Sequence, residues 1–306
     1  MTMNRHAYLI MAHKNWNQLK KLIELLDDER NDIFIHIDAK SQLDTRAQEM
    51  VTSSAASSKI TFVERVPVQW GDYSVIRAEL NLLRAAANGN FQYYHLLSGM
   101  DLPLKPQDEI HAFFDRNSGK EYIQYLDDTW TKKTQTRVRY YWYFQDKIGN
   151  RKKQHPLYIL QRLLLGLQKL AGVNRCREYN AKTGAQWFSI TNELAAYLCK
   201  NEMKIEKRFS RTFCPDEWMV QTLAFEYGFV DSSHYSDTKD SILRLIDWER
   251  GAPYTLRIQD YDELMASGCL FARKFDETVD EEIIEKICET LSVCPSIDDI
   301  SPSGSV

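Results

Sequence analysis

The acidic pair Asp216 and Glu217 stands where the sequence predicts the start of a helix. The pair lies in the stretch FCPDEW, residues 213–218, and a helical pattern runs on to residue 227. Proline is favoured at the first position of a helix, and acidic residues in the first turn complement the helix dipole. A fixed glutamate can also serve as a general base that takes the proton from an attacking hydroxyl. The residues alone leave both interpretations open for Glu217.

Two adjacent cations, Arg273 and Lys274, stand between aromatic residues in the stretch LFARKFD, residues 270–276. Arg binds phosphate oxygens through a planar fork, and Lys supplies a point charge. A diphosphate leaving group needs such positive charge as its bond breaks. Arg257, earlier in the chain, could add a third cation. Pairing with acidic residues at the surface is the competing interpretation.

The carboxylates of this sequence do not support a metal site. Asp260 and Asp262 form a D-x-D motif, but no apolar strand directly precedes them and a helical pattern follows, which favours helix capping. Asp101 is the single carboxylate of the stretch SGMD, whereas a divalent ion takes two or more oxygen ligands. The Gly-rich signatures of dinucleotide-binding and P-loop proteins are missing from the sequence. We therefore expect no metal and no other cofactor.

Two tryptophans are candidates for contact with a sugar. Trp248 ends a short predicted strand, and Trp187 follows Gly184-Ala185-Gln186. A tryptophan in either place can present its ring to a ligand or pack in the core. The sequence pattern leaves this choice open as well.

Short apolar strands alternate with amphipathic helices over the first hundred residues. The pattern predicts strands at 7–11, 33–37, 59–63 and 92–97, and helices at 16–28, 42–51 and 74–87. This order predicts an α/β fold with a mainly parallel, twisted sheet flanked by helices on both faces. Ligands of such sheets bind outside the carboxyl ends of the strands. Those ends carry residue types that suit a nucleotide, namely His13, Asp38, Trp70, Gly71 and Asp101.

The second half of the chain has a more mixed pattern. Helices are predicted at 156–170, 216–227 and 278–291, and strands at 187–190 and 243–246. No repeat or linker divides the chain, so we expect one domain over residues 1–295. Its nucleotide-binding half would end at about residue 125, and its acceptor and catalytic half would follow. The tail, 296–306, is rich in Ser and is predicted to be disordered.

A basic and aromatic stretch, residues 131–153, precedes the Leu-rich helical pattern. It contains eight Lys or Arg residues. Together with the leucines, residues 131–175 could dock on an anionic membrane. We favour the alternative, in which the leucines pack on the sheet and the cations are solvated.

Composition narrows the class of protein. The chain has 306 residues, of which 43% are hydrophobic and 27% charged, as in soluble globular proteins. Its net charge of −4 argues against a dedicated nucleic-acid binder. The sequence has no signal-peptide pattern, no apolar run of about 18 residues, and six cysteines without metal-like spacing. We expect free thiols and a cytoplasmic location, peripheral at the inner face of the membrane if residues 131–175 dock there.

Eight blocks of the sequence resemble the core-2/I-branching β-1,6-N-acetylglucosaminyltransferase and peptide O-xylosyltransferase family, the family 14 "Branch" glycosyltransferases. They occur in the family's order over about residues 5–290. The blocks are AYLIMAH at 7–13, HIDAKS at 36–41, VQWG at 68–71, HLLSGMDLPLK at 95–105, GAQW at 184–187, CPDEW at 214–218, DW at 247–248 with GAPY at 251–254, and LFARKFD at 270–276.

The resemblance implies a GT-A-like fold and an inverting reaction that needs no metal. It implies that Glu217 is the catalytic base and that Lys274, with Arg273 and Arg257, holds the diphosphate. Asp38 falls on a uridine-side position, and Trp248 falls on an acceptor-side aromatic. We add His13, Trp70, Gly71 and Asp101 to the donor side, and Trp187 and Asp216 to the substrate side. The animal members carry a membrane anchor and stem, whereas this sequence looks like a soluble, bacterial-type member.

These observations predict a glycosyltransferase that uses a UDP-sugar, with N-acetylglucosamine or xylose as the favoured sugars. The acceptor would be a hydroxyl of a glycan or lipid-linked glycan, in cell-surface polysaccharide or glycolipid synthesis. The alternative is a non-catalytic nucleotide- or sugar-binding module on the same fold. Glu217 together with Arg273 and Lys274 favours the enzyme, and we expect no nucleic-acid partner.

Overall fold

The computed structural model describes residues 4–151, 155–230 and 241–292. The tail at 296–306, which the sequence predicts to be disordered, lies outside the described residues. Among the described residues, no helix is both long enough and apolar enough to cross a membrane.

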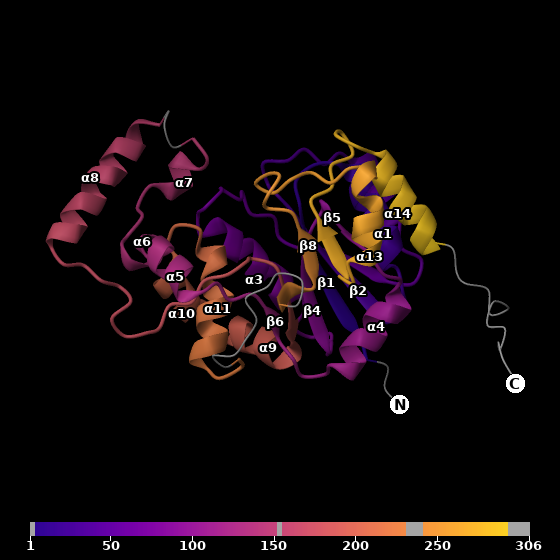
Figure 1. Cartoon of the computed structure of the whole chain (residues 1–306), viewed down its shortest axis with the longest axis horizontal. Coiled ribbons are helices and arrows are strands. Elements are labelled where there is room, and N and C mark those ends of the chain that lie inside the picture. Colours follow the sequence, from indigo (N-terminus) through magenta and orange to yellow (C-terminus); the bar gives the residue numbers. More distant parts are fainter. Residues whose placement is uncertain (1–3, 152–154, 231–240, 293–306) are drawn as a thin grey trace, which may run out of the picture.

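A six-stranded sheet runs through the centre of the molecule (Figure 1), in the order β3-β2-β1-β4-β7-β6. The strands are β1 (His6–Ala12), β2 (Asn31–Ile37), β3 (Lys59–Phe62), β4 (Tyr93–Ser98), β6 (Tyr122–Ile123) and β7 (Phe188–Thr191). The first four strands of this order are parallel, while β7 is antiparallel to both β4 and β6. The predicted α/β class with a mainly parallel sheet is confirmed. The second half of the chain adds one strand to this sheet, β7, which runs antiparallel between β4 and β6.

Helices cover both faces of this sheet. The helices of the first half are α1 (Trp16–Leu26), α2 (Thr45–Thr52), α3 (Ser74–Ala86) and α4 (Gln107–Arg116). Successive side chains of a strand point to opposite faces. Accordingly, Tyr8 and Ile10 of β1 belong to a core cluster with α1, whereas Ala7 and Leu9 belong to a second cluster with α3. The near-continuous apolar pattern of β1 therefore reflects burial on both faces.

A small second sheet lies beside the first and consists of β5 (Asp101–Pro103), β9 (Phe271–Arg273) and β8 (Arg244–Ile246), in that order. Strand β5 is antiparallel to β9, and β8 is parallel to it. This register places Asp101 directly opposite Arg273. Two residues that lie far apart in the sequence thus become neighbours at one end of the molecule's core.

The remaining described elements follow the chain through the second half. They are α5 (Asp128–Thr134), α6 (Thr136–Arg139), α7 (Gln145–Ile148), α8 (Pro156–Leu170), α9 (Asn192–Lys200), α10 (Glu202–Phe209), η1 (Pro215–Glu217), α11 (Met219–Glu226), η2 (Ile258–Asp260), α13 (Tyr261–Ala266) and α14 (Glu282–Ser292). The predicted helix at 216–227 is interrupted at Trp218, between η1 and α11. The last helix begins at Glu282 rather than 278, because Asp280 accepts a hydrogen bond from the Ile283 amide and so caps it.

Helix α8 corrects the interpretation that its leucines pack on the sheet. Leu163 is 62% exposed and Leu167 is 60% exposed, whereas Gln161 and Leu165 are buried. Figure 1 shows α8 at one end of the molecule, apart from the central sheet. The side with Gln161 and Leu165 faces the protein, and Gln161 accepts a hydrogen bond from the Tyr143 amide and donates one to the Tyr141 carbonyl.

Candidate functional site

Two of the predicted donor-side residues are the first residues after two of the parallel strands. His13 comes directly after β1 and Asp38 directly after β2, so both stand at the carboxyl edge of the sheet, as predicted. The Asp38 carboxylate accepts hydrogen bonds from the backbone amides of Lys40, at 2.9 Å, and Val68, at 3.3 Å. One of its oxygens therefore fixes the loop that follows β3. The other lies 3.8 Å from the ammonium of Lys40.

The VQWG loop contacts the loop that precedes Glu217. The carbonyl of Gly71 accepts a hydrogen bond from the Cys214 amide at 2.9 Å. Gly71 has a φ of 71°, and a Cβ there would lie 2.8 Å from the Phe213 ring, so glycine is required on both counts. The Trp70 ring, 47% exposed, meets the Phe213 ring edge to face at 5.5 Å. A donor-side loop is thereby joined to the loop that carries the candidate base.

Arg273 is held between a carboxylate and an aromatic ring. Its guanidinium lies 3.3 Å from the buried Asp101 carboxylate and 3.9 Å from the centre of the Trp187 ring. Burial raises the pKa of Asp101, and the charge of Arg273 opposes that rise. Burial also lowers the pKa of Arg273. The ring and the carboxylate therefore fix a desolvated cation in one orientation.

Positive groups crowd the end of β1. Burial, together with Lys14 and Arg273, lowers the pKa of Lys274. Burial and the charges of Lys14 and Lys274 also lower the pKa of His13, against the opposing charge of Asp38. Like charges that lower each other's pKa are relieved when an anion binds between them. This corner of the molecule is therefore suited to a diphosphate.

Glu217 ends the short helix η1 with its carboxylate accessible. Its side chain is 38% exposed and forms an ion pair with Arg137 of α6. Burial raises the pKa of Glu217, and the charge of Arg137 opposes that rise. Its backbone carbonyl accepts hydrogen bonds from the Gly184 amide and the Thr183 hydroxyl, at 3.0 and 2.9 Å. The backbone of Glu217 is fixed, while its acidic group can still reach a ligand.

Asp216 is half-buried, with one carboxylate oxygen turned away from solvent, and it lies near a fully buried acid. Burial, followed by the charge of Glu217, raises the pKa of Asp216 to about 7. Glu79 of α3 is 1% exposed, and burial followed by the charge of Asp216 raises its pKa well above the usual range. The Gln186 amide donates a 2.7 Å hydrogen bond to Glu79. Among the described residues, one oxygen of Asp216 has no hydrogen-bond partner.

The GAQW segment spans the distance between the candidate base and the cations. The Gly184 amide binds the Glu217 carbonyl, and three residues later the Trp187 ring lies against Arg273. Three residues of chain reach at most about 10 Å. A Cβ at Gly184 would lie 1.9 Å from the Gln124 carbonyl oxygen, so only glycine allows this close approach. The segment thus links the backbone of Glu217 to the guanidinium of Arg273 through a short stretch of chain.

Arg257 and Trp248 lie near this corner without a direct contact in the described residues. The backbone amide of Leu256, beside Arg257, donates a 2.9 Å hydrogen bond to the Lys274 carbonyl. The Arg257 side chain itself is exposed. Trp248 is 56% exposed, in the turn after β8. Its ring is open to solvent, as a stacking surface would be.

The capping interpretation of the D-x-D motif is confirmed for Asp260. One oxygen of Asp260 accepts from the backbone amide of Arg257 at 2.8 Å and caps η2, and the other binds Arg250 at 2.7 Å. Asp262 lies in the first turn of α13. Within the described ranges, His, Cys, Asp and Glu form no cluster of three or more that could hold a metal ion.

Sequence reasoning missed three polar residues of the site. They are Arg137, which pairs with Glu217, and the hydrogen-bonded pair Glu79 and Gln186. Gln186 stood inside a recognised block and Arg137 inside the basic stretch, yet neither was singled out. Glu79 carried a usable signal, since a single acid on the apolar face of a helix is rarely buried without a purpose.

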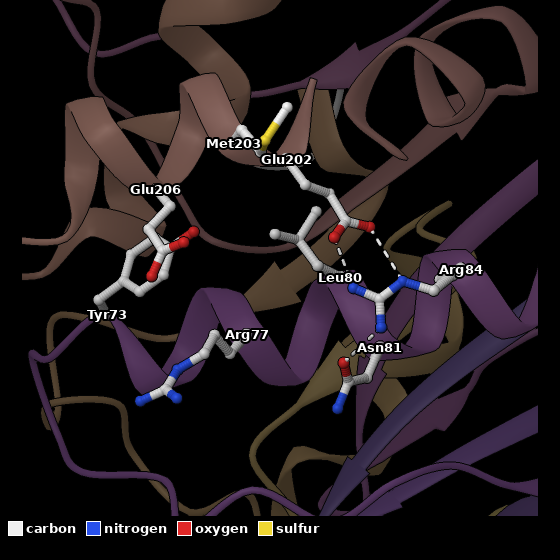
Figure 2. A pocket seen from close by; sticks show the side chains of 8 residues that line it. All are labelled: Tyr73, Arg77, Leu80, Asn81, Arg84, Glu202, Met203 and Glu206. Atoms are coloured by element: carbon white, nitrogen blue, oxygen red, sulfur yellow. Dashed lines mark hydrogen bonds and ion pairs between the residues drawn. The ribbon is translucent and has the colours of Figure 1, made fainter. Parts of the chain in front are cut away.

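Two cavities lie outside the predicted residues. One, of about 210 Å³, lies between α3 and α10 (Figure 2). There Arg84 already forms an ion pair with Glu202, so its charge would attract a bound anion only weakly. The other, of about 400 Å³, opens at the start of α1 and includes Asn15, whose side chain binds Asp276 of the LFARKFD stretch.

The family model of the Core-2/I-Branching enzyme matches residues 6–265 of this chain. The match covers most of the chain, which therefore belongs to this family, and the resemblance drawn from the eight blocks is confirmed. The chain is a glycosyltransferase by family.

Curated relatives agree with the family match. Human β-1,3-galactosyl-O-glycosyl-glycoprotein β-1,6-N-acetylglucosaminyltransferase is 24% identical over 93% of this chain and 71% of its own length. Human xylosyltransferase 2 is 23% identical over 92% of this chain but only 33% of its own length. Among solved structures, mouse xyloside xylosyltransferase 1 in its apo form aligns with 88% of this chain and 97% of its own, at a TM-score of 0.36 and 10% identity. A likeness at that TM-score adds nothing to the fold described above.

Proposed function

We propose that this chain transfers a sugar, with inversion of configuration, from a UDP-sugar to a hydroxyl of a glycan acceptor. The observation that carries the proposal is the placement of Glu217 and Arg273 at opposite ends of the GAQW segment. An accessible carboxylate and a fixed cation, each held at one end of that short segment, match the two ends of the reaction. The relatives' names favour N-acetylglucosamine or xylose as the sugar.

The donor would lie across the carboxyl edge of the sheet. Asp38 and His13 would face the uridine, with Trp70 and Gly71 forming the adjacent loop. The diphosphate would meet Arg273 and Lys274, in the corner where positive groups lower each other's pKa. Asp101 would act through Arg273, because its carboxylate and the Trp187 ring hold that guanidinium in place. Arg257, which is exposed next to this corner, would add positive charge there.

The transfer step follows from this arrangement. An acceptor hydroxyl oxygen attacks the anomeric carbon from the side of Glu217 and forms the new glycosidic bond. The bond from that carbon to the diphosphate oxygen breaks, and UDP leaves with the electron pair. The hydroxyl proton passes to Glu217, whose raised pKa makes it a stronger base than an ordinary glutamate. One displacement of this kind inverts the configuration without a covalent intermediate.

The side-chain cations would replace a metal ion in this reaction. Arg273 and Lys274 offset the charge on the leaving diphosphate, which is the part that a divalent ion plays in other transferases. A fixed guanidinium needs no rearrangement as that charge develops. We therefore propose that turnover continues in EDTA.

On the acceptor side, the exposed Trp248 ring would stack on a sugar, and Asp216 would support the loop of Glu217 from within. The acceptor would be a glycan or a lipid-linked glycan. Synthesis of a cell-surface polysaccharide or glycolipid, on the cytoplasmic side of the membrane, is the setting that we propose for it.

Release of UDP from a panel of UDP-sugars tests the proposal. UDP-N-acetylglucosamine and UDP-xylose should release UDP in EDTA, faster when glycan acceptors are added, with UDP-glucose and UDP-galactose as comparisons. NMR of the anomeric signal of the product reads the inversion. Binding of UDP without release from any donor, with or without acceptor, would favour the non-catalytic module instead. Release of UDP only in the presence of Mn²⁺ would contradict the proposal that no metal is needed, but not the proposed transfer itself.

A further inference from the structure

Helix α8 exposes apolar side chains that an ordinary surface helix would bury. Ile159 is 67% exposed, Leu163 62%, Leu167 60% and Leu170 87%, whereas Gln161 is fully buried. A surface helix normally faces its apolar stripe to the core and its polar side to water. In α8, these four large apolar residues are exposed while the buried residues are Gln161 and Leu165.

The exposed apolar residues form one continuous stripe. Leu160, Leu163, Leu167 and Leu170 follow one another at steps of three or four residues, so they lie along one side of the helix. At about 100° per residue, this side lies opposite Gln161 and Leu165, which face the protein. The stripe is therefore set to meet something outside this chain, because exposed apolar patches of this kind mark contact surfaces.

The charge around the stripe has one sign. From residue 147 to residue 177 the sequence contains no Asp or Glu, although the whole chain has a net charge of −4. On α8 itself, Arg162 and Lys169 are exposed on one flank of the stripe, and Lys147 and Arg151 are exposed just before it. Positive charge beside an apolar stripe is complementary to a surface that is both apolar and anionic.

Exposed aromatic rings lie close to the same helix. Tyr141 is 37% exposed and Tyr143 41%, and both backbones hydrogen-bond to Gln161 of α8. Tyrosine combines an apolar ring with a polar hydroxyl, and such side chains are enriched where a membrane meets water. The aromatic rings, the cations and the leucines thus come from one continuous part of the chain.

We propose that α8 lies in the headgroup region of an anionic lipid membrane, with its leucine stripe toward the acyl chains. A second copy of this chain fits the stripe less well. In a two-fold dimer the same patch meets itself, so its cations would face cations, and residues 147–177 offer no acid to offset them. An anionic membrane supplies both the missing negative charge and the missing apolar surface.

Membrane docking would place the acceptor side of the molecule near the lipid. Arg137, which pairs with Glu217, lies in α6, and the Trp142 ring a few residues later stacks on Phe213 at 4.7 Å. The segment that carries α8 is therefore also part of the wall around Glu217. The docking itself does not depend on the proposed reaction and can be measured without any sugar donor.

Flotation of the full chain with lipid vesicles tests the proposal. We expect flotation with vesicles of phosphatidylcholine and phosphatidylglycerol, and little with phosphatidylcholine alone. The variant Leu163→Gln/Leu167→Gln should weaken the partition by roughly 100-fold, since each leucine side chain loses its apolar transfer energy. The variant Arg162→Gln/Lys169→Gln should weaken it by roughly 30-fold, at about 1 kcal/mol per cation near an anionic leaflet.

Met203 provides the matched control, because it is an apolar residue that is 87% exposed and lies on another helix, α10. Met203→Gln should float like the wild type. Circular dichroism and UDP binding should be unchanged in every variant, which separates this test from the proposed reaction. No flotation with anionic vesicles, or equal flotation of Leu163→Gln/Leu167→Gln, would overturn the proposal. A dimer in sedimentation that the same variant dissociates, without flotation, would overturn it in favour of self-association.

Discussion

The carboxyl edge of the sheet and helix α8 depart from ordinary solvation in opposite directions. At the edge, the ionisable groups of Asp101 and Arg273 are largely taken out of water, and Glu79 of α3 is buried as well. On α8, large apolar side chains such as Leu163 are exposed while Gln161 is buried. Buried ionisable groups and exposed leucine side chains are both unfavourable in the isolated molecule.

The difference between the two regions indicates what each one binds. The edge has surplus positive charge in a pre-formed corner, which an anion of defined shape can neutralise. Helix α8 has a broad, exposed apolar stripe, which suits an extended surface rather than a small ligand. On the two proposals, the molecule would combine a specific site with a non-specific docking surface, and Arg137 of α6 would contact the specific site through its ion pair with Glu217.

The largest effect that would separate the two regions is expected from Glu217→Gln. Loss of the general base should lower turnover by roughly 10² to 10⁴-fold. The change should leave UDP affinity and vesicle flotation as in the wild type, because it touches neither the cations of the edge nor α8. The α8 variants should show the reverse, normal turnover on soluble substrates with lost flotation.

Glu226→Gln is the matched control for that experiment. Glu226 lies at the end of α11 and forms an ion pair with Arg208, as Glu217 does with Arg137. Its replacement removes a comparable pair and should leave turnover near that of the wild type. If Glu217→Gln kept its turnover within tenfold of wild type, Glu217 would not be the base.

A smaller effect, on stability, is expected from Asp216→Asn. Burial raises the pKa of Asp216 to about 7 in the folded chain, above the ordinary value of 3.8. Its contribution to stability is therefore complete below about pH 4 and is lost as the pH rises to about 7. Between those limits the wild type should lose a few degrees more in Tm than the variant does. Equal pH slopes in thermal denaturation would show that Asp216 is not a buried, proton-binding group.

The strands and the strand-end residues could be predicted because they rest on local patterns. Apolar runs at β1 and β2 show burial on both faces, and the polar residue after each run, His13 or Asp38, stands at the sheet edge by topology. The pairing of Asp101 with Arg273 could not be predicted, because it depends on the register between β5 and β9. Sequence periodicity contains no information on such long-range registers.

The orientation of α8 shows the same limit in another form. Its pattern is amphipathic, but a pattern does not say which side of the helix the rest of the chain covers. Hydrogen bonds from Gln161 and Gln168 to the backbone of Tyr141 decide the orientation, and neither partner is visible in the helix's own sequence. Arg137 was missed for a related reason, since its ion pair with Glu217 crosses 80 residues of chain.

The most direct test of the site is a calorimetric titration of UDP into the full chain in EDTA. We predict that wild type binds and that Lys274→Ala binds roughly 10 to 100-fold more weakly, because it loses a charged contact with phosphate. Arg84→Ala, a cation already neutralised by Glu202 in the cavity of Figure 2, should bind UDP like wild type. Equal affinities of wild type and Lys274→Ala, or binding that appears only when Mn²⁺ is added, would contradict a diphosphate site formed by side-chain cations.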